Sequence, residues 1–268
     1  MDIMKTNPIG CPKLRGNIKS IKYPAWVEIK YDGEFCWLIQ EPDYTKMPNP
    51  CLVNKYGTTR FNSCVIDKYT INKSSVKLLG ELYYKYGMAG DLYSLLSHKQ
   101  DESVLTFRPF DIAEYNERPL LNEPLVERKE ILARLYGSAG ICEGKVVQNE
   151  AEVIDYFQEK TNKGYEGVVV KNLDGRLVIN GACDWVKIKH KDQNDYKITS
   201  IDQHKERVEY SVVTPTVTKI NAVKVMDKVK QTMQVGDIIT IEHQGILPAG
   251  GLRHPVYIAH HKYAGNSI

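Results

Sequence analysis

The 268-residue chain lacks several features that would assign it to a membrane, secreted or zinc-binding class. No stretch approaches the roughly 18 consecutive apolar residues that a membrane-spanning helix needs. The first residues, MDIMKTNPIG, have no apolar core of the kind that a signal peptide carries. None of the six cysteines belongs to a CxxC pair, so neither a zinc site nor a disulfide framework is indicated. We therefore expect a cytoplasmic protein with reduced thiols and no membrane partner.

The chain also lacks a strong net charge, because 36 Lys and Arg stand against 33 Asp and Glu, which gives +3. Such a balance permits a polyanionic partner without requiring one. Hydrophobic residues make up 42% of the chain and charged residues 26%, which suffices for one large core or two smaller ones. Composition alone does not separate an enzyme from a binding module.

Strand and helix patterns alternate up to about residue 190, as in a mixed α/β domain. Strand patterns occupy residues 20–40, 51–57, 76–86, 106–112, 167–171 and 185–189. Helices are expected over residues 90–99, 122–137 and 149–164. In the last of these, Asn149 can act as the N-cap, with Glu152 three residues later.

Beyond residue 190 the helix signal fades and strand patterns take over. The strand-like runs are YKITSI, RVEYSVVT, KINAVKVM, DIITIEHQ and VYIAHH. Five short strands in so little chain are typical of a small barrel of the oligonucleotide-binding (OB) kind. We therefore predict two domains, residues 1–190 and residues 191–268.

The stretch WVEIKYDGEFCWLIQ places Lys30 at the end of an apolar strand, followed by the dipeptide DG. DG between two strand patterns predicts a β-hairpin, with Lys30 as a solvated residue on its outer face. Alternatively, Lys30 is a nucleophile. A lysine amine of ordinary pKa, about 10.4, is charged at neutral pH, but burial or a neighbouring cation lowers that pKa. Taken alone, KYDG favours the hairpin.

Four other residues carry groups suited to nucleotide chemistry. Glu81 and Glu166 are carboxylates at strand edges, where they can hold Mg²⁺ or a ribose. Lys187 and Lys189 alternate along one strand and so share a face, where two cations can meet a polyphosphate. Each residue also has a plain structural interpretation, as a solvated carboxylate or a wet strand face.

The ordered set KYDG, GELY, FDI, EGVVVK and WVKIK, with a β-rich tail behind it, resembles the covalent nucleotidyltransferases, and among them the minimal ATP-dependent DNA ligases. The tail sequence VGDIITIEHQGILPAGGLRHPVYI is similar to the final stretch of that family. RNA ligases typically lack this barrel, and the last motif of mRNA-capping guanylyltransferases reads differently. The resemblance implies an α+β fold, with an adenylation domain of antiparallel sheets and helices followed by a small all-β OB-fold domain.

The resemblance also implies a reaction. Lys30 would attack the α-phosphate of ATP and form a lysyl-AMP, with Mg²⁺ or Mn²⁺ as cofactor. The AMP would pass to the 5′-phosphate of a nick in double-stranded DNA, and the 3′-hydroxyl would displace it. Asp32 matches a carboxylate that takes part in nick sealing.

The remaining family positions would hold the nucleotide. Glu28 and Ile29 match positions near the adenine, and Phe110 matches the aromatic residue that stacks on it. The resemblance further assigns Glu81 to the ribose, Glu166 to the metal with Glu81 as a second ligand, and Lys187 and Lys189 to the phosphates.

The sequence departs from the family pattern in three places. Phe35 stands where many relatives have an arginine, so Arg60 is a candidate to supply that contact. Lys55 replaces the arginine of a Ser-Arg-x-Gly stretch and lacks its bidentate fork. The final RxDK motif is absent, which leaves Arg253 or Lys262 as candidates to orient the pyrophosphate.

The chain begins about 30 residues before Lys30, so we expect no separate N-terminal DNA-binding domain and a monomer that holds DNA with its two domains. Barrel lysines can contribute phosphate contacts: Lys219, Lys224, Lys228 and Lys230. Two alternatives remain open, an RNA or mixed-substrate ligase and a nucleic-acid-binding module whose first domain is inert.

Overall fold

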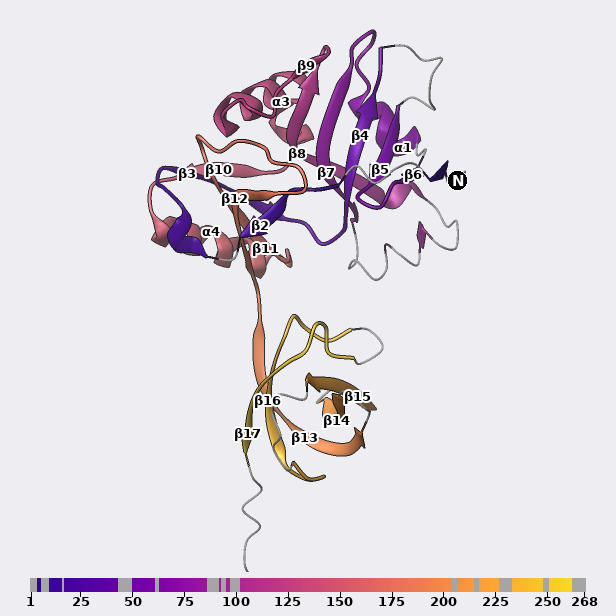
Figure 1. Cartoon of the computed structure of the whole chain (residues 1–268), viewed down its shortest axis with the longest axis vertical. Coiled ribbons are helices and arrows are strands. Elements are labelled where there is room, and N and C mark those ends of the chain that lie inside the picture. The colour runs from indigo at the N-terminus through magenta and orange to yellow at the C-terminus, as the bar shows by residue number, and fades with distance from the viewer. Residues whose placement is uncertain are drawn as a thin grey trace, which may run out of the picture. The chain divides into compact units, whose positions relative to one another are not determined.

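The computed structural model describes residues 4–5, 10–15, 17–42, 50–60, 63–85, 92, 95–96, 102–203, 207–214, 217–226, 233–247 and 251–261. The chain divides into two compact units, Met1–Ile188 and Lys189–Ile268, and each is described here by itself (Figure 1). The boundary expected from the sequence lay two residues further on, after residue 190. Within the described ranges, no helix is long and apolar enough to span a membrane.

The first unit contains a seven-stranded sheet in the order β1-β6-β5-β4-β7-β8-β9, with antiparallel neighbours. Its strands are β1 (Met4–Lys5), β4 (Glu34–Gln40), β5 (Cys51–Asn54), β6 (Thr58–Arg60), β7 (Val76–Tyr84), β8 (Leu105–Tyr115) and β9 (Arg118–Pro119). One face of the sheet packs against α1 (Ser63–Ile66), η2 (Asp67–Tyr69) and α3 (Leu125–Gly140). Val65, Tyr69 and Leu132 bury this face together with Leu78 and Phe107.

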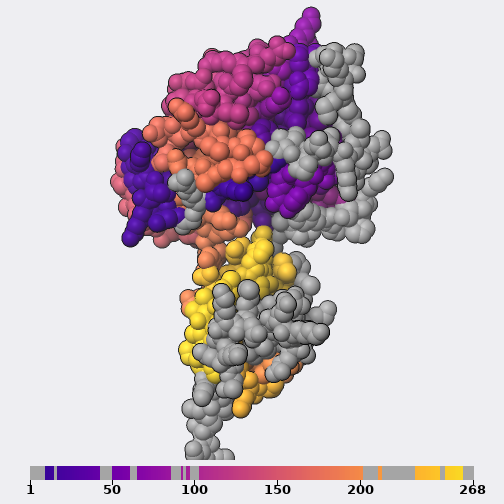
Figure 2. All heavy atoms as spheres, in the orientation of Figure 1, coloured from indigo at the N-terminus to yellow at the C-terminus, as the bar shows by residue number. Residues whose placement is uncertain are grey.

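A second sheet of the first unit has five strands in the order β10-β3-β11-β12-β2. Its strands are β2 (Lys13–Arg15), β3 (Ala25–Lys30), β10 (Gly144–Val147), β11 (Gly167–Asn172) and β12 (Ala182–Lys189), and short 3-10 turns occupy Ile18–Ser20 (η1) and Glu102–Val104 (η3). Strands far apart in the sequence therefore adjoin, as the indigo and orange surfaces of Figure 2 show.

The helix α4 (Glu150–Asn162) covers the outer face of this second sheet. Val153 and Tyr156 of the helix pack with Val27 and Val168 of the strands. Asn149 caps α4 as predicted, because its Oδ1 accepts a hydrogen bond from the Glu152 N–H at 3.0 Å.

The inner faces of the two sheets pack against each other, through a cluster that includes Trp37 and Leu79 of one sheet and Val169 and Trp185 of the other. Side chains alternate along a strand. Val27 and Ile29 face α4, so Trp26, Glu28 and Lys30 of β3 point toward the seven-stranded sheet. The position of Lys30 between the sheets thus follows from the period-two pattern of its strand.

The predicted hairpin around the DG dipeptide is wrong. β3 pairs with β10 and β11, whereas β4 pairs with β5 and β7, so residues 31–33 carry the chain from one sheet to the other. An ideal Cβ on Gly33 would lie 2.2 Å from the carbonyl oxygen of Leu82. The glycine is therefore required for a close passage past β7, and not for a two-residue hairpin turn.

The second unit is a five-stranded antiparallel sheet in the order β15-β14-β13-β16-β17. Its strands are β13 (Asp192–Gln203), β14 (Arg207–Thr214), β15 (Val217–Met226), β16 (Ile238–His243) and β17 (Val256–His261). All five coincide with strand patterns of the sequence. The edge strands β15 and β17 approach each other within 8 Å between Cα atoms, so the sheet curls on itself over a core that includes Tyr196 and Ile241.

Some predictions fall on residues that are not described. Of the helix expected over residues 90–99, only Leu92, Leu95 and Leu96 are described, and they are helical. The side chains of the barrel lysines Lys219, Lys224, Lys228 and Lys230, and that of Lys262, lie outside the described residues.

Candidate active site

Lys30 and Glu166 form an ion pair where the two sheets face each other. Lys30 is the last residue of β3, and Glu166 directly precedes β11, whose first residue, Gly167, is the cross-strand partner of Lys30. The Lys30 Nζ lies 2.5 Å from Glu166 Oε2. The Lys30 side chain is 21% exposed and that of Glu166 is 7% exposed. The amine thus remains accessible from solvent while a carboxylate holds it.

Glu81 on β7 of the opposite sheet acts electrostatically on this pair. Burial raises the pKa of Glu81 to about 8, the Lys30 charge opposes that shift, and the charges of Glu166 and Asp32 add to it. The Gly33 amide donates a hydrogen bond to Glu81 which, like the Lys30 charge, lowers its pKa. The four residues Lys30, Asp32, Glu81 and Glu166 are hereafter the Lys30 cluster. The structure brings together in it four residues that the sequence had suggested from three separate motifs.

Replacement of Glu81 by Gln should stabilise the fold at neutral and alkaline pH. The pKa of Glu81 is raised in the fold, so its proton is retained more tightly than in the unfolded chain. Stability is therefore lost as the pH rises from about 4.5 toward about 8. The glutamine side chain of the variant cannot ionise and escapes this loss, which is at most about 1.4 kcal/mol per pH unit. Urea unfolding of both proteins at two pH values between those limits measures the difference.

The matched control for this experiment is Glu150→Gln, at the exposed first residue of α4. That variant should track the wild type at both pH values. An advantage of Glu81→Gln that stays the same at the two pH values would contradict the raised pKa of Glu81.

Glu28 lies on the same face of β3 as Lys30, but its carboxylate is already engaged. It is 2% exposed. It accepts hydrogen bonds from Trp26 Nε1 at 2.8 Å and from Lys129 Nζ at 2.5 Å, and it pairs with Lys171. A carboxylate offers about four lone-pair sites, so one acceptor position remains for a bound base. The side chain of Ile29, by contrast, lies in the core that faces α4.

A second buried ion pair adjoins this one. Arg128 of α3 and Asp111 of β8 are both fully buried, and they form two parallel hydrogen bonds, Nε to Oδ1 at 2.7 Å and a terminal nitrogen to Oδ2 at 2.9 Å. Burial alone would raise the pKa of Asp111, but Arg128 outweighs that effect and holds the pKa below its ordinary value. Lys129, the residue after Arg128, lies between the two pairs. Its amine pairs with Glu28 and also donates, at 2.8 Å, to the carbonyl of Phe110, the residue before Asp111.

Phe110, the predicted adenine-stacking residue, is surrounded by aromatic rings and a cation. The ring of Trp185 meets it edge-on at 5.9 Å, and that of Phe35 lies at 6.2 Å. Lys171 Nζ lies 4.7 Å from the Phe110 centroid and 3.9 Å from that of Trp185. Phe35, where relatives have an arginine, thus contributes apolar surface beside Phe110.

Lys187 and Lys189 close β12. Because side chains alternate, they continue the row of Cys183 and Trp185 that faces the seven-stranded sheet. Lys187 is exposed. Lys189 is the first residue of the second unit and donates to Gln244 Oε1 at 3.4 Å.

The three predicted DNA-phosphate residues lie on different elements, two in the first unit and one in the second. Arg60 ends β6, is 8% exposed and pairs with Glu34, which leaves little of its guanidinium for a ligand. Lys55 is exposed in the β5–β6 turn, with its Nζ 4.8 Å from the centroid of the Tyr56 ring. Arg253 belongs to the second unit, where its N–H donates to the Gly245 carbonyl at 3.0 Å.

Across the described residues, no group of three or more His, Cys, Asp or Glu side chains is arranged to hold a metal ion. Mg²⁺ is commonly bound by one or two carboxylates together with substrate phosphates. Glu81 and Glu166, whose charges act on each other, supply oxygen donors of that kind. The donor set therefore suits a magnesium ion that arrives with a nucleotide.

Sequence reasoning missed the buried cations Lys129, Lys171 and Arg128 and the carboxylate of Asp111. A signal was available, because alternation along β3 turns Glu28 inward and a buried carboxylate requires cationic partners. Lys171 ends EGVVVK, and the sequence pattern indicates only that it borders the apolar run of that strand. Asp111 stands next to the predicted Phe110 in the sequence.

Known proteins match part of this chain in sequence and most of it in fold. The model of the family described as ATP dependent DNA ligase domain matches residues 67–189. A DNA ligase of Methanospirillum hungatei is 37% identical over 82 residues, which are 30% of this chain and 15% of that protein. DNA ligase 1 of Methanosarcina mazei is 33% identical over 105 residues, 38% of this chain and 18% of that protein. The chain thus matches less than a fifth of either relative.

A solved structure described as "DNA binding with a minimal scaffold: Structure-function analysis of Lig E DNA ligases" shares the fold. Its TM-score is 0.72 at 15% identity, and the likeness covers 94% of this chain and 99% of that one. The likeness to this structure shows the fold, and residues 67–189 match the model of the ATP-dependent DNA ligase domain.

Proposed function

We propose that this chain, of which residues 67–189 match the ATP-dependent DNA ligase domain model, seals nicks in duplex DNA through a lysyl-AMP intermediate on Lys30. The main supporting observation is the Lys30 amine, held 2.5 Å from Glu166 and facing Glu81 across the two sheets. A partly exposed lysine that a carboxylate holds in place, with that carboxylate within reach to accept a proton, suits an amine that must give up a proton and then attack an electrophile.

In the first step, Lys30 Nζ attacks the α-phosphorus of ATP. An N–P bond forms, the bond to the pyrophosphate oxygen breaks, and pyrophosphate leaves. The amine must lose protons for this attack, and Glu166 is within hydrogen-bond reach to accept one. The Lys30–Glu166 pair therefore both positions the nucleophile and provides a route for its proton.

The charge that develops on the phosphates needs cationic partners. Glu166, with Glu81, would hold Mg²⁺ or Mn²⁺, which supplies charge neutralisation at the phosphate oxygens when bound. Lys187 and Lys189, side by side on the inner face of β12, would hold the triphosphate as point charges. Arg253 is a further candidate to orient the pyrophosphate, and we favour Lys187 and Lys189 over it.

The adenine would lie against Phe110, near Glu28 and the backbone of Ile29. The aromatic surroundings of Phe110 suit base stacking, which is worth about 1–3 kcal/mol per base in nucleic-acid complexes. The one acceptor position left on Glu28 matches the single donor, an exocyclic amine, that adenine presents at its base edge.

In the second step the AMP passes from Lys30 to the 5′-phosphate of the nick, and in the third the 3′-hydroxyl attacks that phosphate and AMP leaves. Asp32, a member of the Lys30 cluster, would act in this sealing step. The curled five-stranded sheet of the second unit would serve as an OB-fold domain and help a monomer hold the nicked duplex. Lys55, more than the buried Arg60, offers an exposed cation for DNA phosphates.

Lys30→Ala should abolish the covalent adenylate, because no other group takes the place of the nucleophilic amine. Wild-type protein incubated with Mg²⁺ and ATP labelled at the α-phosphate should carry label through a denaturing gel, whereas the variant should carry none. Lys22→Ala, which removes an exposed lysine of the same unit, is the matched control. A variant that labels as strongly as the wild type would show that the nucleophile is another residue.

Substrate arms of the same assay decide between the neighbouring functions. Labelling by GTP in place of ATP would point to capping chemistry. Sealing that requires ribose on both sides of the nick would replace the DNA ligase by an RNA ligase. Binding of DNA without any nucleotide label would leave only a nucleic-acid-binding module.

A further inference from the structure

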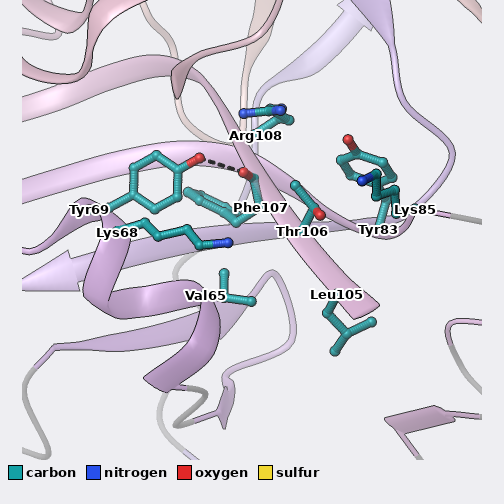
Figure 3. A pocket seen from close by; sticks show the side chains of 9 residues that line it. All are labelled: Val65, Lys68, Tyr69, Tyr83, Lys85, Leu105, Thr106, Phe107 and Arg108. Carbon is teal, nitrogen blue, oxygen red and sulfur yellow. Dashed lines mark hydrogen bonds between the residues drawn. The ribbon is translucent and has the colours of Figure 1, made fainter. Parts of the chain in front are cut away.

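A second site, which the proposed reaction does not use, is a cavity of about 210 Å³ at the end of the β7–β8 pair. Its walls come from α1 and η2 on one side and from β7 and β8 on the other, as Figure 3 shows. The volume is below the roughly 300–1,000 Å³ of small-molecule pockets. It exceeds what a single water molecule needs. It therefore suits one small group rather than a whole nucleotide.

The lining of this cavity is cationic. Lys68, Lys85 and Arg108 carry positive charge, and among the described residues that line it there is no Asp or Glu. Thr106 adds a hydroxyl, and in Figure 3 the Lys68 amine points into the space between η2 and β8. A ring of cations and a hydroxyl without a carboxylate is complementary to a multivalent anion.

Arg108 is fixed in this lining by the protein itself. It donates to the Ala139 carbonyl at 2.9 Å, and its charge opposes the rise that burial causes in the pKa of the Tyr69 and Tyr83 phenols. Tyr69 in turn donates to the Phe107 carbonyl at 2.7 Å (Figure 3). A guanidinium that is already oriented loses little further side-chain entropy when a ligand binds.

The cavity joins the two faces of the seven-stranded sheet. Val65, Tyr69 and Phe107 belong to the face that α1 and η2 cover, whereas Arg108 and Tyr83 belong to the face of the Lys30 cluster. Arg108 is the cross-strand partner of Glu81, and Tyr83 follows Glu81 by two residues and so shares its face. Tyr83 also stacks on Tyr31, the residue after Lys30, with 4.6 Å between ring centroids. Tyr83 thus belongs both to the cavity wall and to the surroundings of the nucleophile.

We propose that this cavity, hereafter the Arg108 pocket, binds a phosphate group, and that the phosphate comes from the backbone of the nucleic acid. The proposal rests on the proposed function. The triphosphate of ATP is the other source of such a group. Its proposed partners Lys187 and Lys189, however, lie on β12, in the five-stranded sheet of the first unit. The Arg108 pocket is built on the seven-stranded sheet, which favours a phosphate further along the bound strand.

The test is a double variant, Lys68→Gln with Lys85→Gln, which removes two exposed charges of the lining and leaves Arg108 in place. The control is Lys19→Gln with Lys22→Gln, which removes the same charge from exposed positions elsewhere in the unit. Binding to a nicked duplex is measured between about 50 and 200 mM salt, and the KM for ATP is measured in lysine adenylation.

We expect the pocket variant to bind the nicked duplex about tenfold more weakly than the control at low salt. The slope of log affinity against log salt should fall by about 0.9 for one lost phosphate contact, and the KM for ATP should match the control. A raised KM for ATP with unchanged DNA binding would support the pocket as a phosphate site and assign it to the triphosphate. Equality with the control in both measurements would overturn the proposal. Wild-type sealing in the same series tests the proposed function separately.

Discussion

Asp111→Ala is expected to lower the free energy of unfolding by about 3–5 kcal/mol, because it strands a buried guanidinium. Arg128 and Asp111 have no exposed side-chain surface, so water cannot replace the two hydrogen bonds that the carboxylate accepts. Arg128 would retain only the carbonyl oxygens of Glu123 and Gly175 as acceptors. Urea unfolding of the wild type and the variant measures the loss.

Two comparisons sharpen this prediction. Glu159→Ala removes an exposed carboxylate that pairs with Lys163 and Lys160. It should have a far smaller effect, because water screens Glu159 and Lys160 keeps its pair with Glu143. Replacing both buried partners, Asp111→Leu with Arg128→Met, should recover much of the loss, since an apolar pair leaves no unpaired charge. If Asp111→Ala proved no worse than Glu159→Ala, the buried pair would not be a stabilising contact.

The same pair predicts acid sensitivity. Because the pKa of Asp111 is below its ordinary value in the fold, its contribution is complete above the unfolded-state pKa of about 3.9 and is lost as the pH falls through the lower folded-state pKa. The gap in stability between the wild type and Asp111→Ala should therefore narrow only at strongly acid pH.

Glu28→Ala is expected to have an effect of similar size, about 3–5 kcal/mol, because one carboxylate serves two buried cations. Lys129 is 6% exposed and Lys171 is 1% exposed, and both pair with Glu28. Burial already lowers the pKa of Lys171 below its ordinary value, Glu28 opposes that shift, and Lys129 adds to it. Without Glu28, the pKa of Lys171 should fall further.

This shift gives the variant a distinctive pH dependence. A lysine whose folded-state pKa is depressed binds fewer protons in the fold than in the unfolded chain, so stability rises with pH up to the unfolded-state pKa of about 10.4. Between neutral pH and about pH 9, Glu28→Ala should therefore recover more stability than the wild type gains. Glu28→Gln, which keeps the shape and one acceptor oxygen, should lie between the two. Parallel stability curves for all three proteins would mean that water solvates the two lysines.

The period-two patterns of the sequence predicted most of the strands. The strands β7, β8, β11 and β12 and the five strands of the second unit all fall where the sequence pattern predicted them, because alternating or continuous apolar runs are the sequence signal of a strand. The motif order also led to Lys30, Glu81 and Glu166, which the structure brings into one cluster. These three residues could be predicted because an amine or a carboxylate suggests its chemistry from the residue type alone, without knowledge of its spatial neighbours.

The errors arose where pairing decides the outcome. The DG dipeptide describes a local bend, and nothing local tells whether the strands on either side will pair with each other or with distant strands. The roles of Lys129 and Lys171 depend on Glu28, which lies more than 100 positions from Lys129 in the sequence. Arg60 looked like a free cation because its partner Glu34 lies on another strand.

The three-residue crossing from β3 to β4 makes the candidate site a product of the whole first unit. Lys30 ends β3 of one sheet and Glu81 lies on β7 of the other, and residues 31–33, which include Asp32, carry the chain from β3 into the seven-stranded sheet. Of the Lys30 cluster, the seven-stranded sheet alone would present only Glu81, and the sheet of β3 and β11 would present Lys30 and Glu166. Under the proposed function, competence for adenylation would depend on the docking of two separately hydrogen-bonded sheets, and a partly assembled chain would be inactive.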